Sequence, residues 1–385
     1  MMQNKYIRKV LGVIILLMMA SCVKTYEPNL DIKDTQKIVV SGQLSDQEGM
    51  QSVAISVTSK LDFPKEIPLS NCTVKLKASN GHTWNYTEIE DGLYQLWLSN
   101  NELDLNLNYH IEVLTPDKQL IVSDDERFYD CPDVENLHYE RAEKYNELTL
   151  NINSGLQFFI DFKGSLTDSR YYYYEVIETS EFHTPRPIEW WYDGVVHHEV
   201  PADYSKSLCW NTQRINDVFV LSTDNLSSNE YKMFSINFTS NQSQRLQHLY
   251  SLLVKQYSIS NEAYVYWKQM QINMHQSGGL YNNQPIAAKG NMKNVDNPEA
   301  DVLGYFMLGK VKERRFFIPP QGLEIIDNTC GKPAILRFGL RDIDPIQYPA
   351  YLDGDQNRYF NSLLDKGCVD CTSQGGTTTK PSFWP

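Results

Sequence analysis

The chain has 385 residues, of which 41% are hydrophobic, and this is enough apolar material to bury a sizeable core. Its formal net charge is −13 and the sequence has no Lys/Arg cluster, which excludes a typical nucleic-acid binder, because phosphate backbones are recognised by dense positive charge. The length alone suggests two domains.

The first segment, residues 1–21, is predicted to be a secretory signal peptide. Basic residues precede an apolar run over 10–19, and small residues follow it. The run is shorter than the roughly 20 residues that span a bilayer, so no transmembrane helix is expected. Because the small residues lead into Cys22 as in a bacterial lipobox, we predict that Cys22 carries acyl chains, with residues 22–36 as a tether to the membrane. An ordinary signal that happens to end near a cysteine is the alternative.

The next segment, residues 37–125, has the pattern of short β-strands. Val53, Ile55 and Val57 alternate with small or polar residues, and Asn80-Gly81 is typical of a hairpin turn. We therefore predict an N-terminal immunoglobulin-like or transthyretin-like β-sandwich.

Residues 126–385 are predicted to form a second, β-rich and sandwich-like domain. The run RYYYYEVI over 170–177 strongly favours a strand. One segment departs from this pattern, because residues 260–276 have a helical period with Ala263 and Trp267 on one face. The overall fold class is therefore mainly β, with one inserted amphipathic helix.

Six cysteines remain after Cys22, and the predicted location beyond the cytoplasm favours disulfides. We expect three bridges. Cys72 would pair with Cys131 near the first domain, and the other four cysteines would tie the tail to the second domain, with their pairing open. A redox-active CxxC at the C-terminal end and a metal site are the alternatives, although no second CxxC is present for a four-thiolate zinc site. The six are Cys72, Cys131, Cys209, Cys330, Cys368 and Cys371.

Three consecutive aromatic residues are the candidate binding surface. Trp190, Trp191 and Tyr192 precede a turn, where exposed rings can stack on a sugar or contact a peptide or protein partner. The alternative is that alternate members of this run fill the core. His197 and His198 follow, but neighbours on a strand point to opposite faces, so a shared metal ion is not expected. No catalytic motif, metal site or cofactor site is predicted.

Several segments together resemble a known family. They are the lipobox with Tyr26-Glu27-Pro28, IVVSGQLSD, Cys209-Trp210, LLVKQYSISNEAYVYWKQM, KGNMKNVDNPEADVLGYF and the tail CVDCTSQGGTTTKPSFWP. In these the chain resembles the Bacteroidota lipoproteins grouped as domain of unknown function 4249. The resemblance implies an outer-membrane lipoprotein encoded beside a TonB-dependent receptor, and it supplies no catalytic residues.

The expected function is that of a non-enzymatic, lipid-anchored accessory or ligand-presenting protein. Its partners would be the membrane, through Cys22, and a TonB-dependent outer-membrane receptor with its ligand. A hydrolase with a cleft between two β domains and a purely structural envelope component are the alternatives. The sequence leaves open whether the protein faces the periplasm or the exterior.

Overall fold

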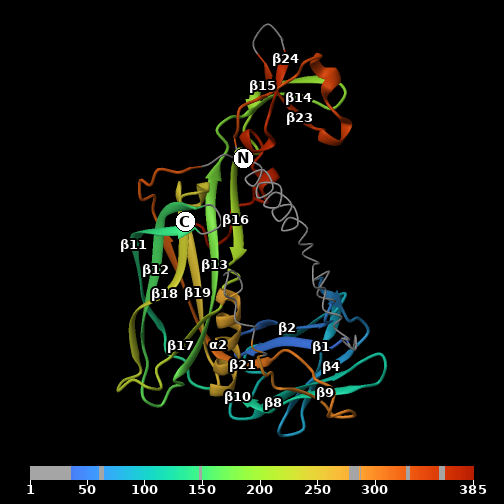
Figure 1. Cartoon of the computed structure of the whole chain (residues 1–385), viewed down its shortest axis with the longest axis vertical. Helices are drawn as coiled ribbons and strands as arrows, with labels where there is room; N and C mark the ends of the chain where they lie inside the picture. The colour runs from blue at the N-terminus through green and yellow to red at the C-terminus, as the bar shows by residue number, and fades with distance from the viewer. Residues whose placement is uncertain are drawn as a thin grey trace, which may run out of the picture.

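A computed structural model describes residues 36–59, 65–146, 150–276, 286, 288–326, 330–354 and 360–385. Over these residues the chain is mainly β, as predicted, and carries one α-helix (Figure 1). None of the helices in this part of the chain combines the length and the apolar character needed to cross a membrane. The predicted signal peptide, Cys22 and nearly all of the predicted tether lie outside the described residues.

The first sandwich consists of two sheets that enclose one core. Alternate residues such as Val53 and Ile55 on one sheet and Ile111 and Val113 on the other are almost fully buried, which is the predicted alternation. One sheet contains β1 (Ile38–Ser45), β2 (Gly49–Val57), β3 (Ile67–Pro68), β6 (Thr87–Glu90) and β7 (Leu93–Leu98). The other contains β4 (Thr73–Ala78), β5 (Thr83–Asn85), β8 (Asn108–Leu114), β9 (Leu120–Ser123), β10 (Glu126–Arg127) and β20 (Met292–Asn294).

The second sandwich packs a three-stranded sheet against a larger one. Tyr172 and Tyr174 face the core between the sheets, where Phe158 lies, and Tyr173 faces the other way. The smaller sheet contains β11 (Val134–Asn146), β12 (Asn151–Lys163) and β18 (Glu230–Ser240). The larger contains β13 (Tyr171–His183), β16 (Leu208–Arg214), β17 (Phe219–Ser222), β19 (Tyr250–Ser258) and β21 (Phe306–Ile318).

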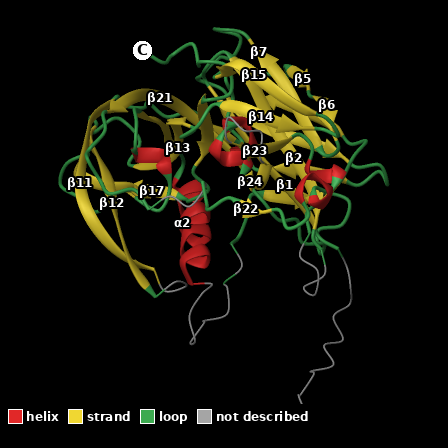
Figure 2. Cartoon of the chain, turned by 90° about the horizontal axis from the view of Figure 1, so that it is seen from above, coloured by secondary structure: helices red, strands yellow, loops and turns green. Residues whose placement is uncertain are grey.

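The helix α2 (Asn261–Gln276) covers the outer face of this larger sheet, beside β13 and β17 (Figure 2). It begins after Ser260, whose Oγ accepts a hydrogen bond from the Ala263 amide at 3.2 Å, as expected of an N-cap. Ala263 is completely buried, and the Trp267 ring lies 5.0 Å from that of Tyr173. The predicted helix is thus confirmed, and its apolar face packs on the sheet.

One continuous sheet joins the two sandwiches. β1 pairs in parallel with the start of β21, from Gly42 opposite Phe306 to Ser45 opposite Gly309, while the rest of β21 pairs with β19. Phe306 therefore belongs to the core of the first sandwich, together with Met292 of β20. The predicted boundary at residue 125 does not separate the two cores, because the chain returns to the first one more than halfway along its length.

Two residues allow β1 to pair with the start of β21, a connection that we call the joint. Gly304 has a φ of +97°, and a Cβ atom there would lie 1.9 Å from the Val40 carbonyl oxygen, so only glycine allows the strands to approach. Asn291 is buried, and its side-chain amide donates to the Phe306 carbonyl and accepts from the Phe306 amide, both at 2.9 Å. The segment KGNMKNVDNPEADVLGYF, residues 289–306, therefore connects the two sandwiches.

A third lobe, which the sequence did not predict, lies at one end of the molecule (Figure 1). Its five-stranded sheet combines a hairpin inserted between β13 and β16 with strands from the C-terminal part of the chain. These strands are β14 (Ile188–Tyr192), β15 (Val196–Asp203), β22 (Ala334–Ile335), β23 (Ala350–Gly354) and β24 (Phe360–Leu364). Short 3-10 helices also occur in the chain, namely η1 (Gln244–Leu246), η2 (Gly339–Asp342), η3 (Pro345–Gln347), η4 (Lys366–Cys368) and η5 (Cys371–Gln374).

Two disulfides hold the C-terminal tail. Cys330 is bonded to Cys368, and Cys371 is bonded to Cys209 on β16. The two cysteines of the CxxC segment thus have different partners, which argues against a redox pair and against a metal site formed by these thiols. Four of the six predicted disulfide cysteines are therefore bridged, and they do tie the tail to the second domain.

The predicted bridge between Cys72 and Cys131 is wrong, since both are free thiols. They are anchored in different places: Cys72 Sγ lies 3.6 Å from the Leu69 carbonyl oxygen in the first sandwich, and Cys131 Sγ lies 3.3 Å from that of Gln256 on β19. Burial raises the pKa of Cys131 to about 11, so at neutral pH this thiol stays protonated and unreactive.

After the disulfides the tail returns along the second sandwich. Gly376 passes so close to Cys209 and Phe182 that a Cβ atom would lie 2.8 Å from side-chain atoms of both. Trp384 is buried with its ring against Phe317 of β21, whereas Phe383 stays on the surface under the Arg315 guanidinium. The indole of Trp384 is therefore the apolar anchor of the chain end.

The joint between the sandwiches can be tested with Asn291→Ala. This change leaves the buried amide and carbonyl of Phe306 without their partner, at a cost of about 1–3 kcal/mol for each unpaired group. We expect a matching loss in the free energy of unfolding, measured by urea denaturation. The control Asn297→Ala, at an exposed position in the same segment, should stay within about 0.5 kcal/mol of wild type. Equal losses in the two variants would contradict the assigned role of Asn291.

Candidate functional site

The three predicted binding aromatics do not form an open surface. Trp190 is only 6% exposed, lies in the core of the third lobe, and is stacked on His198 with ring centroids 3.6 Å apart. Trp191 is half-buried and stacked on His197 at 3.8 Å, and its indole nitrogen donates to Glu199. The prediction of a shared aromatic platform is therefore wrong for Trp190, because alternate members of this strand face the core.

The remaining member of the run, Tyr192, is also engaged within the lobe. Its ring packs edge-on against that of Tyr348 with centroids 5.4 Å apart. His197 and His198 stack on different tryptophans and so face opposite sides of β15, as the strand pattern predicted.

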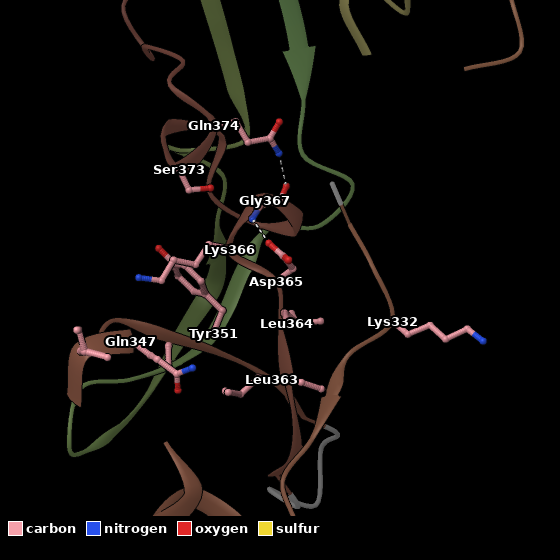
Figure 3. A pocket seen from close by; sticks show the side chains of 13 residues that line it. Lys332, Gln347, Tyr351, Leu363, Leu364, Asp365, Lys366, Gly367, Ser373 and Gln374 are labelled. Atoms are coloured by element: carbon pink, nitrogen blue, oxygen red, sulfur yellow. Dashed lines mark hydrogen bonds between the residues drawn. The ribbon is translucent and has the colours of Figure 1, made fainter. Parts of the chain in front are cut away.

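A cavity of about 680 Å³ lies in the third lobe beneath the C-terminal tail (Figure 3). Two hydrogen bonds lie in its wall: Gln374 Nε2 donates to the Gly367 carbonyl at 3.2 Å, and the Gly367 amide donates to Asp365 at 3.0 Å. The side chains of Lys332 and Lys366 extend in opposite directions in Figure 3. The polar groups here do not converge on a common point, so this cavity is a weak candidate for a binding site.

A second cavity of about 510 Å³, which we call the sheet cleft, lies where the two sandwiches meet. Its wall is one face of the continuous sheet, from β2 and β1 across to β19 and β13. On β1, Val40 and Leu44 point into the first core, so Ser41 and Gln43 face the cleft. The other lining residues are Gly42, Ser45, Gln47, Glu48, Gly49, Met50, Gln51, Ser52, Ala54, Leu93, Tyr173, Glu175, Arg214, Lys255, Tyr257 and Trp267.

A hydrogen-bond network connects the two sandwiches across this cleft. The Tyr257 hydroxyl accepts from Gln43 Nε2 at 3.1 Å and donates to Glu175 at 3.2 Å. Arg214 forms an ion pair with Glu175 at 3.3 Å and donates to the Tyr173 hydroxyl at 3.0 Å. Because each side chain is held by a neighbour, the wall of the cleft presents fixed donors and acceptors rather than mobile ones.

The electrostatics of the cleft are balanced. The lining contains two acidic residues, Glu48 and Glu175, and two basic residues, Arg214 and Lys255, so the lining charges sum to zero. Burial disfavours the charge on Arg214, but Tyr173 and Glu175 outweigh it, and its pKa lies above the usual value. Burial also raises the pKa of Tyr257, with Glu175 adding to the effect, so its hydroxyl stays protonated. This arrangement suits a polar ligand without net charge.

An exposed tryptophan lies next to the cleft. Trp97 on β7 is directly opposite Met50 on β2, and the side chains of such a pair share one face of the sheet. Since Met50 lines the cleft, Trp97 extends the same face, and the two side chains are 55% and 56% exposed. Trp97 was not predicted as a candidate, although the strand pattern carries a signal: Tyr94 and Leu98 point inward, so Trp97 points outward.

A cluster of metal-ligand types lies elsewhere on the larger sheet of the second sandwich. Glu181, His183 and His248 each place a ligand atom within 4.8 Å of the others. Burial lowers the pKa of His248, and the neighbouring His183 adds to this effect. No metal site was predicted, and no motif indicates this cluster, because His248 lies far from the other two residues in the chain.

A model of the family described as Domain of unknown function (DUF4249) matches residues 23–315, well over half of the chain. The chain belongs to this family. In this DUF4249 protein the matched residues include both sandwiches up to Arg315, near the end of β21, and thus the joint and the sheet cleft. No curated protein matches the sequence.

Two solved structures of alpha-2-macroglobulin from Escherichia coli also align with this DUF4249 protein. The trypsin-activated form shows 10% identity and a TM-score of 0.20, over 59% of this chain and 15% of the macroglobulin. The form activated by porcine elastase shows 9% identity and a TM-score of 0.19, over 86% of this chain and 26% of the macroglobulin. The chain thus spans about a quarter or less of these proteins.

Stability measurements should separate the two kinds of tryptophan. Trp190→Ala removes a buried ring from the third lobe and should lower the free energy of unfolding by about 3–5 kcal/mol. Trp97→Ala removes an exposed ring and should change it by no more than about 0.5 kcal/mol. Chemical denaturation followed by circular dichroism measures both. A large loss on Trp97→Ala would show that this ring is structural and not available to a ligand.

Proposed function

We propose that this protein is a non-enzymatic, lipid-anchored binding protein of the outer membrane. In this proposal the sheet cleft receives a short, uncharged oligosaccharide, which the protein presents to a TonB-dependent receptor. The observation that carries the proposal is the convergence of fixed polar groups beside an exposed indole ring at the meeting of two domains, where ligand sites are frequently found.

The chemistry of the cleft supports a polyhydroxylated ligand. Sugar hydroxyls both donate and accept hydrogen bonds, and the cleft offers amide, hydroxyl, carboxylate and guanidinium groups from Gln43, Tyr257, Glu175 and Arg214. Trp97 provides an apolar surface with a polar edge on which the flat face of a sugar ring can stack. The balance of two acidic and two basic residues gives no net attraction for a strongly charged ligand.

The two carboxylates of the cleft already hold protein groups, which favours binding over catalysis. Glu175 is bonded to Tyr257 and paired with Arg214, and Glu48 accepts a hydrogen bond from the Asn100 amide at 3.2 Å. No histidine is found among the described residues that line the cleft. A hydrolase would need Glu48 and Glu175 as its acid and base, so hydrolysis of a bound oligosaccharide is the outcome that would favour the alternative.

Anchoring at Cys22 would bring the bound ligand close to its receptor. Acyl chains on this residue would restrict the protein to the membrane plane and raise its effective concentration near a receptor in the same membrane. The predicted tether would then set how far the cleft can reach from the bilayer.

The binding proposal is tested by titrating the full chain with neutral oligosaccharides, using calorimetry and analysis of the sugars after incubation. We expect saturable binding that is weakened at least about tenfold by Trp97→Ala and by Arg214→Ala, since each removes contacts of about 1.4 kcal/mol or more. Tyr204→Ala, which removes another exposed ring at a position far from the cleft in the sequence, is the control and should bind as wild type does. Binding of peptides instead of sugars, or equal affinity in all variants, would refute the proposal.

The location is tested separately with Cys22→Ser in the natural host. The wild-type protein should fractionate with the outer membrane and carry acyl chains detectable by mass spectrometry, whereas the variant should not be retained there. A pull-down from detergent-solubilised outer membrane should recover a TonB-dependent receptor with the wild-type protein. Recovery of an unmodified, freely released wild-type polypeptide would exclude the anchored role, whatever the cleft binds.

A further inference from the structure

Three side chains with metal-binding chemistry meet at one end of the larger sheet in the second sandwich. Glu181 and His183 are two positions apart on β13, so they lie on the same face of the strand. The Glu181 amide donates to the Leu249 carbonyl at 3.2 Å, which brings His248, just before β19, beside them. His183 Nε2 lies 3.0 Å from Glu181 Oε1, and the rings of the two histidines are stacked 4.0 Å apart.

The types and spacing of these donors fit a zinc ion. Two imidazoles and one carboxylate form a common ligand set for Zn²⁺, whereas Mg²⁺ and Ca²⁺ prefer oxygen alone. Bonds of about 2.0–2.1 Å in a tetrahedral site place ligand atoms about 3.3 Å apart. The ligand atoms here lie within 4.8 Å of one another. To bind one ion, the two stacked imidazole rings would turn out of their parallel arrangement, because each nitrogen lone pair lies in the plane of its ring.

The surroundings of the cluster resemble the outer shell of a metal site. The second oxygen of Glu181, Oε2, accepts a hydrogen bond from Trp384 Nε1 at 3.0 Å, which orients the carboxylate. Phe182, between the two ligands on β13, is paired in register with Cys209, so the strand segment is fixed by the disulfide to Cys371. The cluster is thus held by the sheet on one side and by the C-terminal tail on the other.

The geometry points to a zinc site formed by Glu181, His183 and His248, supported by Trp384. An ion bound there would fix Glu181, and through it the buried indole that anchors the end of the chain. Zinc would in this way link the tail to the second sandwich at a point some distance along the tail from the disulfides. This inference does not depend on what the sheet cleft binds.

The site is tested by calorimetric titration of the full, metal-stripped chain with Zn²⁺ alone. We expect one ion per chain. Loss of a residue that only orients a ligand weakens metal binding by about 10- to 100-fold, and His183→Ala and His248→Ala should each weaken zinc binding by more than this. Trp384→Phe, which removes the hydrogen bond to Glu181 and keeps an aromatic ring at this position, should weaken binding by about tenfold. His197→Ala is the matched control, because His197 is partly exposed and also lies beside a carboxylate, that of Asp193 at 2.9 Å.

A second readout keeps the inference testable if a variant fails to fold. Co²⁺ added to the wild-type chain should give the intense visible absorption of a tetrahedral site, and Zn²⁺ should displace it. Absence of stoichiometric zinc binding, a weak octahedral cobalt spectrum, or zinc retained by the His183→Ala/His248→Ala double variant would each overturn the assignment. The same holds if His197→Ala loses zinc as fully as the ligand variants do.

Discussion

The pairing of β1 with the start of β21 is the contact on which the rest of the structure depends. It joins one sheet of each sandwich into a single continuous sheet. The pairing requires the buried Asn291, which bonds the backbone amide and carbonyl of Phe306, and Gly304, where no side chain fits. The sheet cleft exists only because of this joint, since its walls come from strands of both sandwiches. A change that loosened the joint would therefore alter the candidate binding site before it unfolded either core.

The sequence predicted what local periodicity determines. The mainly-β class, the strand over 170–177, the helix after Ser260 and the membership of the tail cysteines in disulfides all follow from short-range patterns or from the predicted compartment. Alternation along a strand also correctly placed His197 and His198 on opposite faces. These features require no knowledge of which distant segments meet.

What the sequence did not predict depends on long-range pairing. The third lobe forms from a hairpin and a C-terminal segment separated by the whole of α2 and β21, and its core takes up Trp190. For the same reason no pattern identified Trp97, the zinc-ligand cluster or the separate positions of Cys72 and Cys131. Cysteine number suggested three bridges, but only the fold shows which thiols lie within bonding distance.

The topology also constrains the order in which the molecule can assemble. A chain is synthesised from its N-terminus, and the strand that completes the edge of the first sheet emerges more than 250 residues after the strand it must join. Until then β1 has an unpaired edge, and unpaired edges invite association with other chains. A helper protein that shields nascent strands during export would therefore matter more for this fold than for a protein whose neighbouring strands are consecutive in sequence.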